Sequence, residues 1–185
     1  MQNTIKVAFL IIFLTALSCK NKTHKTESNS QETPHLSEEK KEYTKEISVY
    51  DFNALQALLH QKNDTTYLVN FWAMWCAPCV KELPYFEGYA LKNKEEKTKV
   101  IFVSLDFKKD IETRLKPFLS KKNITSEVVL FDPKNTDGWM KNVDPNWSGG
   151  LPFTIIYNAK EREFYERTFE SIEDIEKTVQ EFTTP

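Results

Sequence analysis

The chain has 185 residues, which suits one domain with a sizeable core. Its 25 Lys and Arg residues almost balance its 27 Asp and Glu residues, so the net charge of −2 argues against a dedicated nucleic-acid-binding protein, which needs a basic face to neutralise phosphates. A hydrophobic content of 40% and only three cysteines exclude a collagen-like chain, a polytopic membrane protein and a disulfide-dense scaffold.

An uncharged apolar run occupies residues 7–17 and follows a start with one lysine. As a helix it would span roughly 16 Å, about half of the hydrocarbon core of a bilayer, so an export signal is expected rather than a transmembrane helix. Leu17-Ser18-Cys19 resembles the end of a bacterial lipoprotein signal. The resemblance implies a signal peptide over residues 1–18 and lipidation of Cys19, which would anchor the protein on the periplasmic side of a bacterial cell envelope. An uncleaved anchor is the alternative, and it gives the same topology.

Residues 19–46 are predicted to form a disordered tether, because Lys, Glu, Ser, Thr, Asn and Gln dominate them and Leu36 and Tyr43 stand nearly alone as apolar residues. Such a segment cannot bury enough surface to offset the entropy lost on ordering. His24 and His35 lie in this tether. A weak metal-binding role is an alternative for them, but solvated linker residues are the simpler interpretation.

Residues 47–185 are predicted to form one folded domain in which strands alternate with helices. The predicted strands are apolar runs typical of buried strands, at residues 67–72, 99–105 and 127–131. The predicted helices lie at residues 51–59, from Cys76 to about Asn93, at 111–122 and at 172–182. Asp51 and Ser171 are expected to cap the first and last of these helices, and Pro117 should kink the third or mark its boundary.

A loop and a hairpin are predicted between the third strand and the last helix. Residues 132–150 are dense in Asp, Asn, Pro and Gly, so we expect a loop with one helical turn around Trp139. Two further runs, 153–157 and 164–169, flank a turn at 158–161 and indicate a β-hairpin. Strands alternating with helices, then a hairpin and a terminal helix, predict an α/β fold with a mixed central sheet flanked by helices.

Two cysteines occupy the junction between the first predicted strand and the following helix, in the motif Cys76-Ala77-Pro78-Cys79. A helix N-terminus presents unpaired N–H groups and about half a positive charge, which stabilise a thiolate at the first cysteine. We therefore expect Cys76 to be the nucleophile and Cys79, one turn deeper, to resolve the mixed disulfide. Pro78 suits the first turn, where its missing N–H leaves no hydrogen bond unmade.

Two other roles are compatible with a C-x-x-C motif. It can be half of a zinc or copper site, but structural zinc needs four ligands and the folded part offers only His60 as a histidine, with none after Cys79. It can also be a structural staple, although a four-residue ring constrains the unfolded chain very little. A redox-active dithiol is favoured, with no metal and no cofactor beyond the disulfide itself.

Residues 69–84, which read Val-Asn-Phe-Trp-Ala-Met-Trp-Cys-Ala-Pro-Cys-Val-Lys-Glu-Leu-Pro, resemble the active-site segment of the exported TlpA/ResA-like thiol-disulfide oxidoreductases of the thioredoxin superfamily. A second match, residues 149–154, falls where that family has a cis-proline. The resemblance covers residues 47–182. It implies a thioredoxin-like fold in which the strand and helix between Lys99 and Phe131 form a central insertion.

The resemblance implies a function as well as a fold. We expect a lipid-anchored periplasmic enzyme that reduces protein disulfides through Cys76 and Cys79, of the kind that the family uses in cytochrome c maturation. Its partners would be disulfide-bearing client proteins and a membrane thiol electron donor. A general disulfide oxidase or isomerase is an alternative, and so is a copper- or zinc-handling binding protein on the same fold.

The client-binding residues are expected from the same resemblance. Pro152 is expected to be cis and to leave the Leu151 backbone free to pair with an extended client segment. Trp75 is expected to shield the sulfurs and to offer a flat contact surface, and Ala77 and Pro78 lie beside it in the motif.

Glu82 is the expected acid/base for Cys79, because Asn70 stands where thioredoxins carry a buried Asp. Glu82 lies three residues beyond Cys79 on the same helical face, and the resembling reductases carry an acid at this position. Partial burial would raise its pKa toward neutrality, where a general acid/base works best. An exposed helical glutamate is the alternative.

Five other residues are expected to have structural roles. Trp72 is expected in the core, and Trp139 and Trp147 are expected to anchor a loop, with a partner-binding surface as the alternative. Asp106 follows a strand end and is expected to cap the next helix, with a place near the cysteines as the alternative. Pro84 should kink the helix that carries the cysteines.

Overall fold

The structure is a computed structural model that describes residues 42–134 and 137–184. The expected signal peptide, the expected lipidation site at Cys19 and residues 20–41 of the expected tether lie outside this part of the chain. Within the described residues, no helix is long and apolar enough to cross a membrane.

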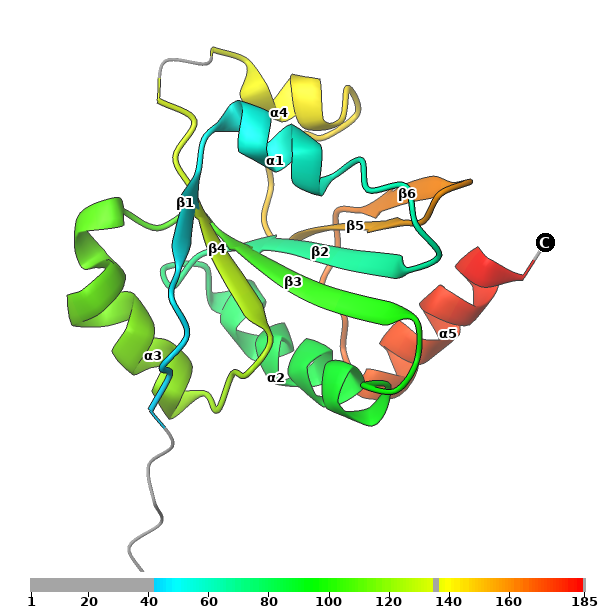
Figure 1. The fold of residues 1–185 in the computed structure, drawn as a ribbon, viewed down its shortest axis with the longest axis horizontal. Coiled ribbons are helices and arrows are strands. Elements are labelled where there is room, and N and C mark those ends of the chain that lie inside the picture. Colours follow the sequence, from blue (N-terminus) through cyan, green and yellow to red (C-terminus); the bar gives the residue numbers. More distant parts are fainter. Residues whose placement is uncertain (1–41, 135–136, 185) are drawn as a thin grey trace, which may run out of the picture. The chain divides into compact units, whose positions relative to one another are not determined.

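A six-stranded mixed sheet forms the centre of the folded domain, with the strand order β1-β4-β3-β2-β5-β6 (Figure 1). Its strands are β1 Ser48–Tyr50, β2 Thr66–Trp72, β3 Thr98–Ser104, β4 Glu127–Phe131, β5 Phe153–Tyr157 and β6 Arg162–Tyr165. The first four strands in this order are parallel to one another, whereas β5 is antiparallel to both β2 and β6. The predicted mixed α/β fold is confirmed.

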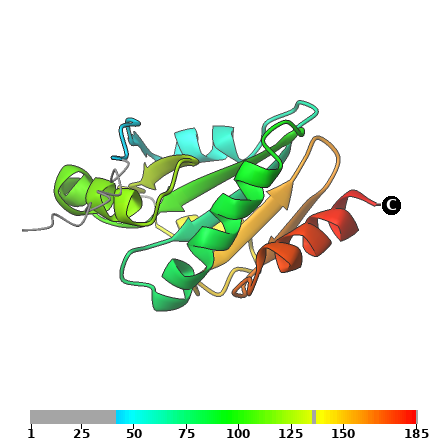
Figure 2. The same cartoon turned by 90° about the horizontal axis from the view of Figure 1, so that it is seen from below.

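Helices cover both faces of the sheet (Figures 1 and 2). The α-helices are α1 Phe52–Leu58, α2 Ala77–Lys92, α3 Lys116–Lys121, α4 Trp139–Val143 and α5 Ile172–Thr183. On one face, α2, α3 and α5 bury a core that contains Leu83, Leu119 and Phe182. On the opposite face, α1 and α4 bury a second core that contains Leu55 and Val143.

Strand β2 is buried along its whole length and contributes to both cores. Because successive strand residues point to opposite faces, Leu68 and Trp72 join the core under α2, whereas Val69 and Phe71 join the core under α1. The same alternation places Asn70 on the α2 face. A buried amide within an apolar stretch of the strand thus enters the core on the side of α2, the helix that begins beside the cysteines.

Helix boundaries follow the predicted signals. Asp51 and Ser171 each accept a hydrogen bond from a backbone N–H three residues later, at 2.9 and 3.2 Å. Pro117 marks a boundary, as predicted, because it lies in the first turn of α3. The residues before it, Ile111–Leu115, form a π-helical stretch instead of a continuous α-helix.

Two features of the sheet differ from the expectations. The sequence does not predict β1, because three residues are too few for a periodic pattern and the strand depends on pairing with β4. The second arm of the hairpin ends at Tyr165 rather than at Phe169. Residues 166–171 therefore form a connection from β6 to α5.

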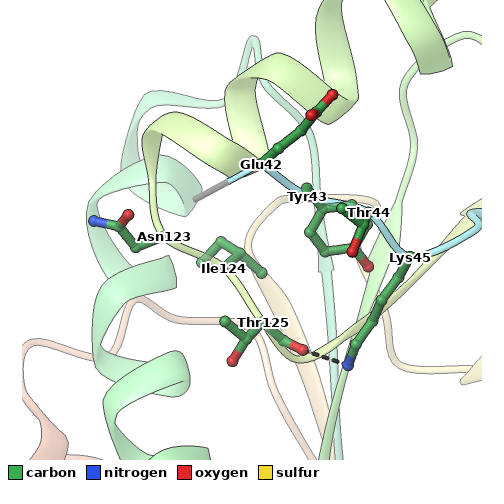
Figure 3. Close-up of a pocket in the computed structure, with 7 residues that line it drawn as sticks. All are labelled: Glu42, Tyr43, Thr44, Lys45, Asn123, Ile124 and Thr125. Carbon is green, nitrogen blue, oxygen red and sulfur yellow. Dashed lines mark hydrogen bonds between the residues drawn. The ribbon is translucent and has the colours of Figure 1, made fainter. Parts of the chain in front are cut away.

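Packing begins at Tyr43, within the segment that the sequence analysis assigned to the tether. Its side chain is buried, and its N–H donates to Ser120 Oγ at 2.8 Å. Figure 3 shows Tyr43 and Lys45 beside Ile124 and Thr125, where they line a groove of about 280 Å³. A lone tyrosine in a polar segment gives no periodic signal, and its hydrogen-bond partners lie 77 and 83 positions away.

Glu87 attaches α2 to the segment that leads into β4. The side chain is buried, and its carboxyl group accepts hydrogen bonds from the N–H groups of Thr125 and Ser126, at 2.8 and 3.0 Å. The Thr125 hydroxyl is a third donor. Hydrogen bonds of this kind typically contribute about 1.5–3 kcal/mol each when a charged group takes part.

Replacing Glu87 with alanine would leave two N–H groups without an acceptor. We therefore expect Glu87→Ala to lower the free energy of unfolding by about 2–4 kcal/mol, measured by denaturation in guanidinium chloride. Glu95→Ala is the control, because 86% of the Glu95 side chain is exposed, and it should stay within about 0.5 kcal/mol of the wild type. A loss below about 1 kcal/mol in Glu87→Ala would mean that this cluster does not hold α2 in place.

Candidate active site

Cys76 and Cys79 form a disulfide at the N-terminus of α2, with their Cα atoms 5.3 Å apart. Strand β2 ends at Trp72, a short loop follows, and Cys76 is the N-cap residue of α2 with an extended backbone. The Cys76 sulfur accepts a hydrogen bond from the Cys79 N–H at 3.4 Å. The first sulfur therefore lies at the free N–H groups of the helix, where a thiolate is stabilised.

The two cysteines differ in their access to solvent. Cys79 is fully buried, whereas 5% of the surface of Cys76 is exposed. Trp75, Ala77 and Pro78, which flank Cys76 in the chain, are all exposed, and Trp75 has 67% of its surface accessible. The residues expected to contact a client thus lie at the surface next to the expected nucleophile.

Glu82 lies one turn beyond Cys79 on α2, and its side chain is fully buried. Its Oε1 atom accepts from Asn70 Nδ2 at 2.7 Å, and its Oε2 atom accepts from the Phe169 N–H at 2.7 Å. Burial raises the pKa of this carboxyl to about 7, because the charged form loses its hydration and the two donors compensate only in part. Glu82 is therefore a buried acid that titrates near neutral pH, and the alternative of an exposed helical glutamate is wrong.

The raised pKa links proton binding at Glu82 to the stability of the fold. The folded state keeps a proton on Glu82 up to about pH 7, whereas the unfolded chain releases it near pH 4.5. The stability contributed by this group is fully present below about pH 4.5 and is lost as the pH rises through about 7. A pKa difference of this size corresponds to roughly 3 kcal/mol, which is a large fraction of the stability of a typical domain.

Asn70 connects Glu82 to the sheet. It lies on β2 opposite Thr154 of β5, and its Nδ2 group donates to Thr154 Oγ1 at 3.0 Å as well as to Glu82. Among the described residues, the Asn70 Oδ1 atom has no hydrogen-bond partner. Because amide and hydroxyl side chains do not titrate near neutral pH, Glu82 is the group in this buried trio that exchanges a proton there.

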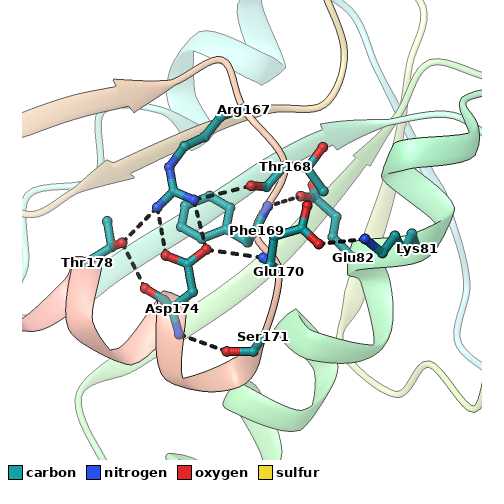
Figure 4. A network of polar contacts seen from close by, with 9 residues as sticks. All are labelled: Lys81, Glu82, Arg167, Thr168, Phe169, Glu170, Ser171, Asp174 and Thr178. Carbon is teal, nitrogen blue, oxygen red and sulfur yellow. Dashed lines mark hydrogen bonds and ion pairs between the residues drawn. The ribbon is translucent and has the colours of Figure 1, made fainter.

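A backbone group that the sequence analysis did not identify completes the Glu82 site. The Phe169 N–H comes from the connection between β6 and α5, 87 residues away, and the Phe169 ring packs against Phe86 of α2 with centroids 5.2 Å apart. Figure 4 shows Arg167, in the same connection, bonded to Asp174 of α5. A backbone N–H has no side-chain signature, so no sequence pattern predicts this contact.

The Leu151–Pro152 peptide bond is cis, as predicted. The loop before it is held by Glu166, whose carboxyl group accepts from the N–H groups of Ser148 and Gly150 at 3.1 and 2.8 Å. A Cβ atom on Gly150 would lie 2.5 Å from Glu166 Oε1, so a larger residue at position 150 would displace the Glu166 carboxyl group. Leu151 itself is half-buried and packs against both cores.

Asp106 does not have the expected role. The next helix, a short 3-10 helix at Lys108–Asp110, has Phe107 and not Asp106 as its N-cap residue. The buried carboxyl group of Asp106 accepts from the Met74 N–H at 3.1 and 3.2 Å and from Ser104 Oγ at 2.9 Å. Because parallel strands β2 and β3 end at the same edge of the sheet, Asp106 meets the loop that leads to Cys76 and anchors it.

The other tryptophans are structural, as expected. Trp72 and Trp147 are buried, and Trp147 Nε1 donates to Gly150 O at 2.8 Å. The Trp139 ring packs against Trp147 with centroids 5.3 Å apart. Pro84 lies inside α2, and the kink expected there stays a prediction.

The described part of the chain contains no group of three or more His, Cys, Asp and Glu side chains that could hold a metal ion. His60 is exposed, and its Nδ1 atom lies 2.8 Å from Gln56 O. His24 and His35 lie outside the described residues.

In the reduced protein, we expect iodoacetamide to alkylate Cys76 at least about tenfold faster than Cys79 at neutral pH, because Cys76 lies at the helix N-terminus and Cys79 is fully buried. Mass spectrometry of digests taken at intervals gives both rates. Single Cys76→Ser and Cys79→Ser variants show whether each thiol keeps its rate without the other. Equal rates, or a faster Cys79, would reverse the assignment of nucleophile and resolving cysteine.

The AhpC/TSA family model matches residues 45–162. ResA, a thiol-disulfide oxidoreductase, is 32% identical over 76 residues in Oceanobacillus iheyensis, covering 41% of this chain and 36% of that protein. ResA of Bacillus thuringiensis is 31% identical over 88 residues, covering 48% and 46%. The chain thus spans less than half of the length of these two relatives.

A solved structure with the same fold is that of a thioredoxin-related protein from Neisseria meningitidis serogroup B, with a TM-score of 0.57 and 24% identity over 73% of this chain and 96% of that one. A DsbF homologue from Corynebacterium diphtheriae has a TM-score of 0.52 and 21% identity, over 64% and 73%. The family match covers more than half of the sequence, and the solved structures share the fold. The chain therefore belongs to the AhpC/TSA family, as a thioredoxin-like member related to the ResA thiol-disulfide oxidoreductases.

Proposed function

We propose that the protein is a thiol-disulfide oxidoreductase of the bacterial cell envelope that reduces disulfides in client proteins through Cys76 and Cys79. One observation carries the proposal: a fully buried acid with a pKa of about 7, Glu82, lies one turn beyond the second cysteine of a disulfide at a helix N-terminus. Such an acid titrates in the pH range in which a thiol must lose its proton to attack. A disulfide with a purely structural role does not need a neighbouring acid that titrates near neutral pH.

The first half of the reaction begins with the Cys76 thiolate, which attacks one sulfur of a client disulfide. A bond forms between the Cys76 sulfur and that client sulfur, the client S–S bond breaks, and the other client sulfur leaves as a thiolate that is protonated by solvent. The N–H groups at the start of α2 stabilise the attacking thiolate.

In the second half, the Glu82 carboxylate takes the proton of Cys79. The Cys79 thiolate attacks the Cys76 sulfur, the mixed disulfide breaks, and the second client sulfur leaves as a thiolate. Two electrons have then passed to the client, and the Cys76–Cys79 disulfide of this structure is the product. The cycle uses the dithiol alone and calls for no bound cofactor.

Client binding is proposed at two segments. Trp75, Ala77 and Pro78 offer an exposed apolar contact beside Cys76. Leu151 precedes Pro152, which has no N–H to donate, and we propose that the Leu151 backbone pairs with an extended segment of the client.

A membrane thiol donor is proposed to return the disulfide to the dithiol, because the structure holds the oxidised form and each turnover consumes one pair of electrons. We further propose that residues 1–18 are a lipoprotein signal, that Cys19 carries the lipid on the periplasmic side, and that cytochrome c maturation uses the reductase. The apolar run before Cys19 and the similarity to ResA support this placement.

The direction of electron flow is testable through the reduction potential. Ala77 and Pro78 add no charge or side-chain donor that would stabilise the Cys76 thiolate further. We therefore expect a potential nearer that of thioredoxin, about −270 mV, than that of DsbA, about −120 mV, a separation of roughly 7 kcal/mol for two electrons. Equilibration with glutathione redox buffers measures it. A potential above about −180 mV, in the range of isomerases, would contradict the proposed reductase function and would favour the alternative of an oxidase or isomerase.

Glu82→Gln tests the acid/base. In the wild type, the rate of insulin disulfide reduction should rise with pH through about 7 as Glu82 becomes a carboxylate. The glutamine variant should lack this rise and should react at least about tenfold more slowly. Glu87→Gln is the control, because Glu87 is a buried glutamate of the same helix whose partners lie before β4. A Glu82→Gln profile that superimposes on the wild type would remove Glu82 from the mechanism.

A further inference from the structure

The connection between β6 and α5, residues 166–171, contacts the buried Glu82 on one side and a surface ion pair on the other (Figure 4). On the inner side, the Phe169 N–H donates to Glu82 Oε2 at 2.7 Å. On the outer side, Arg167 donates to both carboxylate oxygens of Asp174, at 2.8 and 3.0 Å. One short segment therefore joins a surface ion pair to the acid beside the dithiol.

Arg167 makes more contacts than a simple surface ion pair. Its guanidinium also donates to Thr168 O at 3.2 Å and to Thr178 Oγ1 at 3.1 Å. The guanidinium carbon lies 4.0 Å from the centre of the Phe169 ring, which is fully buried. Arg167 thus covers the residue whose N–H contacts Glu82, and the cation–π contact holds the two together.

The start of α5 fixes the other end of the connection. Asp174 lies in the first turn of this helix and accepts from the Glu170 N–H at 3.1 Å as well as from Arg167. Its own N–H donates to Ser171 Oγ at 3.2 Å. Phe169 is therefore held between two residues, Arg167 and Glu170, that bond to the same carboxylate.

The groups that face Glu82 come from β2, from the connection and from α2 itself. Asn70 of β2 is a neutral donor that lowers the pKa of Glu82, and the Phe169 N–H acts in the same sense. Arg167 lowers this pKa through its charge, whereas Glu170 raises it. Lys81 of α2 pairs with Glu170 at 2.5 Å. Arg167 is thus a cation that favours the carboxylate form, and it also holds in place an N–H that does so.

We propose that Arg167 is a positioning residue for Glu82: by holding the connection from outside, it keeps the Phe169 N–H donated to Glu82 and so sets the pH at which Glu82 exchanges its proton with Cys79. This inference rests on the proposed acid/base function of Glu82. It adds a residue that lies 91 positions after the nucleophile and outside the C-x-x-C motif.

Arginine suits this role in a way that lysine does not. A planar guanidinium forms two parallel hydrogen bonds with one carboxylate and stacks on an aromatic ring at the same time. A lysine at position 167 would keep the positive charge but would lose the paired hydrogen bonds and the flat contact with Phe169. The variants Arg167→Lys and Arg167→Gln therefore separate the geometry from the charge.

The test follows Glu82 directly, by NMR titration of the oxidised protein with ¹³C-labelled glutamate carboxyl groups and with the Glu82 signal assigned through Glu82→Gln. We expect Arg167→Gln to raise the pKa of Glu82 by roughly 0.5 or more, and Arg167→Lys to raise it by less. Amide hydrogen exchange of Phe169 should become roughly tenfold faster in both variants. Lys177→Gln is the matched control, because it removes a 76% exposed cation of α5, and it should change neither quantity.

An unchanged Glu82 titration in Arg167→Gln would overturn the proposal. A shift in Arg167→Gln, with wild-type titration and wild-type Phe169 exchange in Arg167→Lys, would assign the effect to charge alone and would also overturn positioning. If Arg167→Gln does not fold, Phe169 exchange in Arg167→Lys decides the question. Failure of the proposed function has a different signature: the pKa of Glu82 would still respond to Arg167, but the pH-rate profile of disulfide reduction would not follow it.

Discussion

The burial of one carboxyl group beside a disulfide is the constraint on which this active site depends. A buried charge is unfavourable unless donors compensate for its lost hydration, and Glu82 has two of them, Asn70 Nδ2 and the Phe169 N–H. These donors lie 12 and 87 positions away in the chain. Strand β2, helix α2 and the connection to α5 must therefore all be in place before the acid acquires its pKa of about 7.

Helix α2 carries two buried glutamates with different surroundings, and the contrast explains what an acid/base site needs. Glu87 gathers three donors from Thr125 and Ser126, which suits a residue that fastens a helix to a sheet. Glu82 receives two donors and keeps a neutral form accessible near pH 7. More donors would favour the carboxylate and lower the pKa, and the group would no longer take up and release a proton at that pH. In the proposed mechanism, this incomplete compensation is what lets Glu82 exchange a proton near pH 7.

Sequence reasoning located the features that depend on near neighbours in the chain: the helix caps, the apolar strands and the reactive cysteines. The rest depends on contacts across the fold. Asp106 meets the Met74 N–H because two parallel strands end together, 32 positions apart. Tyr43 is buried against residues far along the chain. Phe169 donates its backbone N–H to Glu82, and this contact cannot be predicted from the residue type because every residue except proline has such a group. Of the groups that contribute to this buried contact, Glu82 itself could be predicted, from its helical spacing and from family resemblance.

In the proposed mechanism, client recognition and proton transfer depend on different parts of this molecule. The residues around Cys76 are exposed, so their side chains can change with the client without disturbing the core. The groups that set the proton affinity of Glu82 lie in the core and in the connection to α5, outside the C-x-x-C motif. Two proteins with the same four-residue motif can therefore differ in the pH range in which their second cysteine reacts. We therefore propose that the dithiol motif identifies the reaction, whereas the segment that covers the buried acid determines the pH range in which it proceeds.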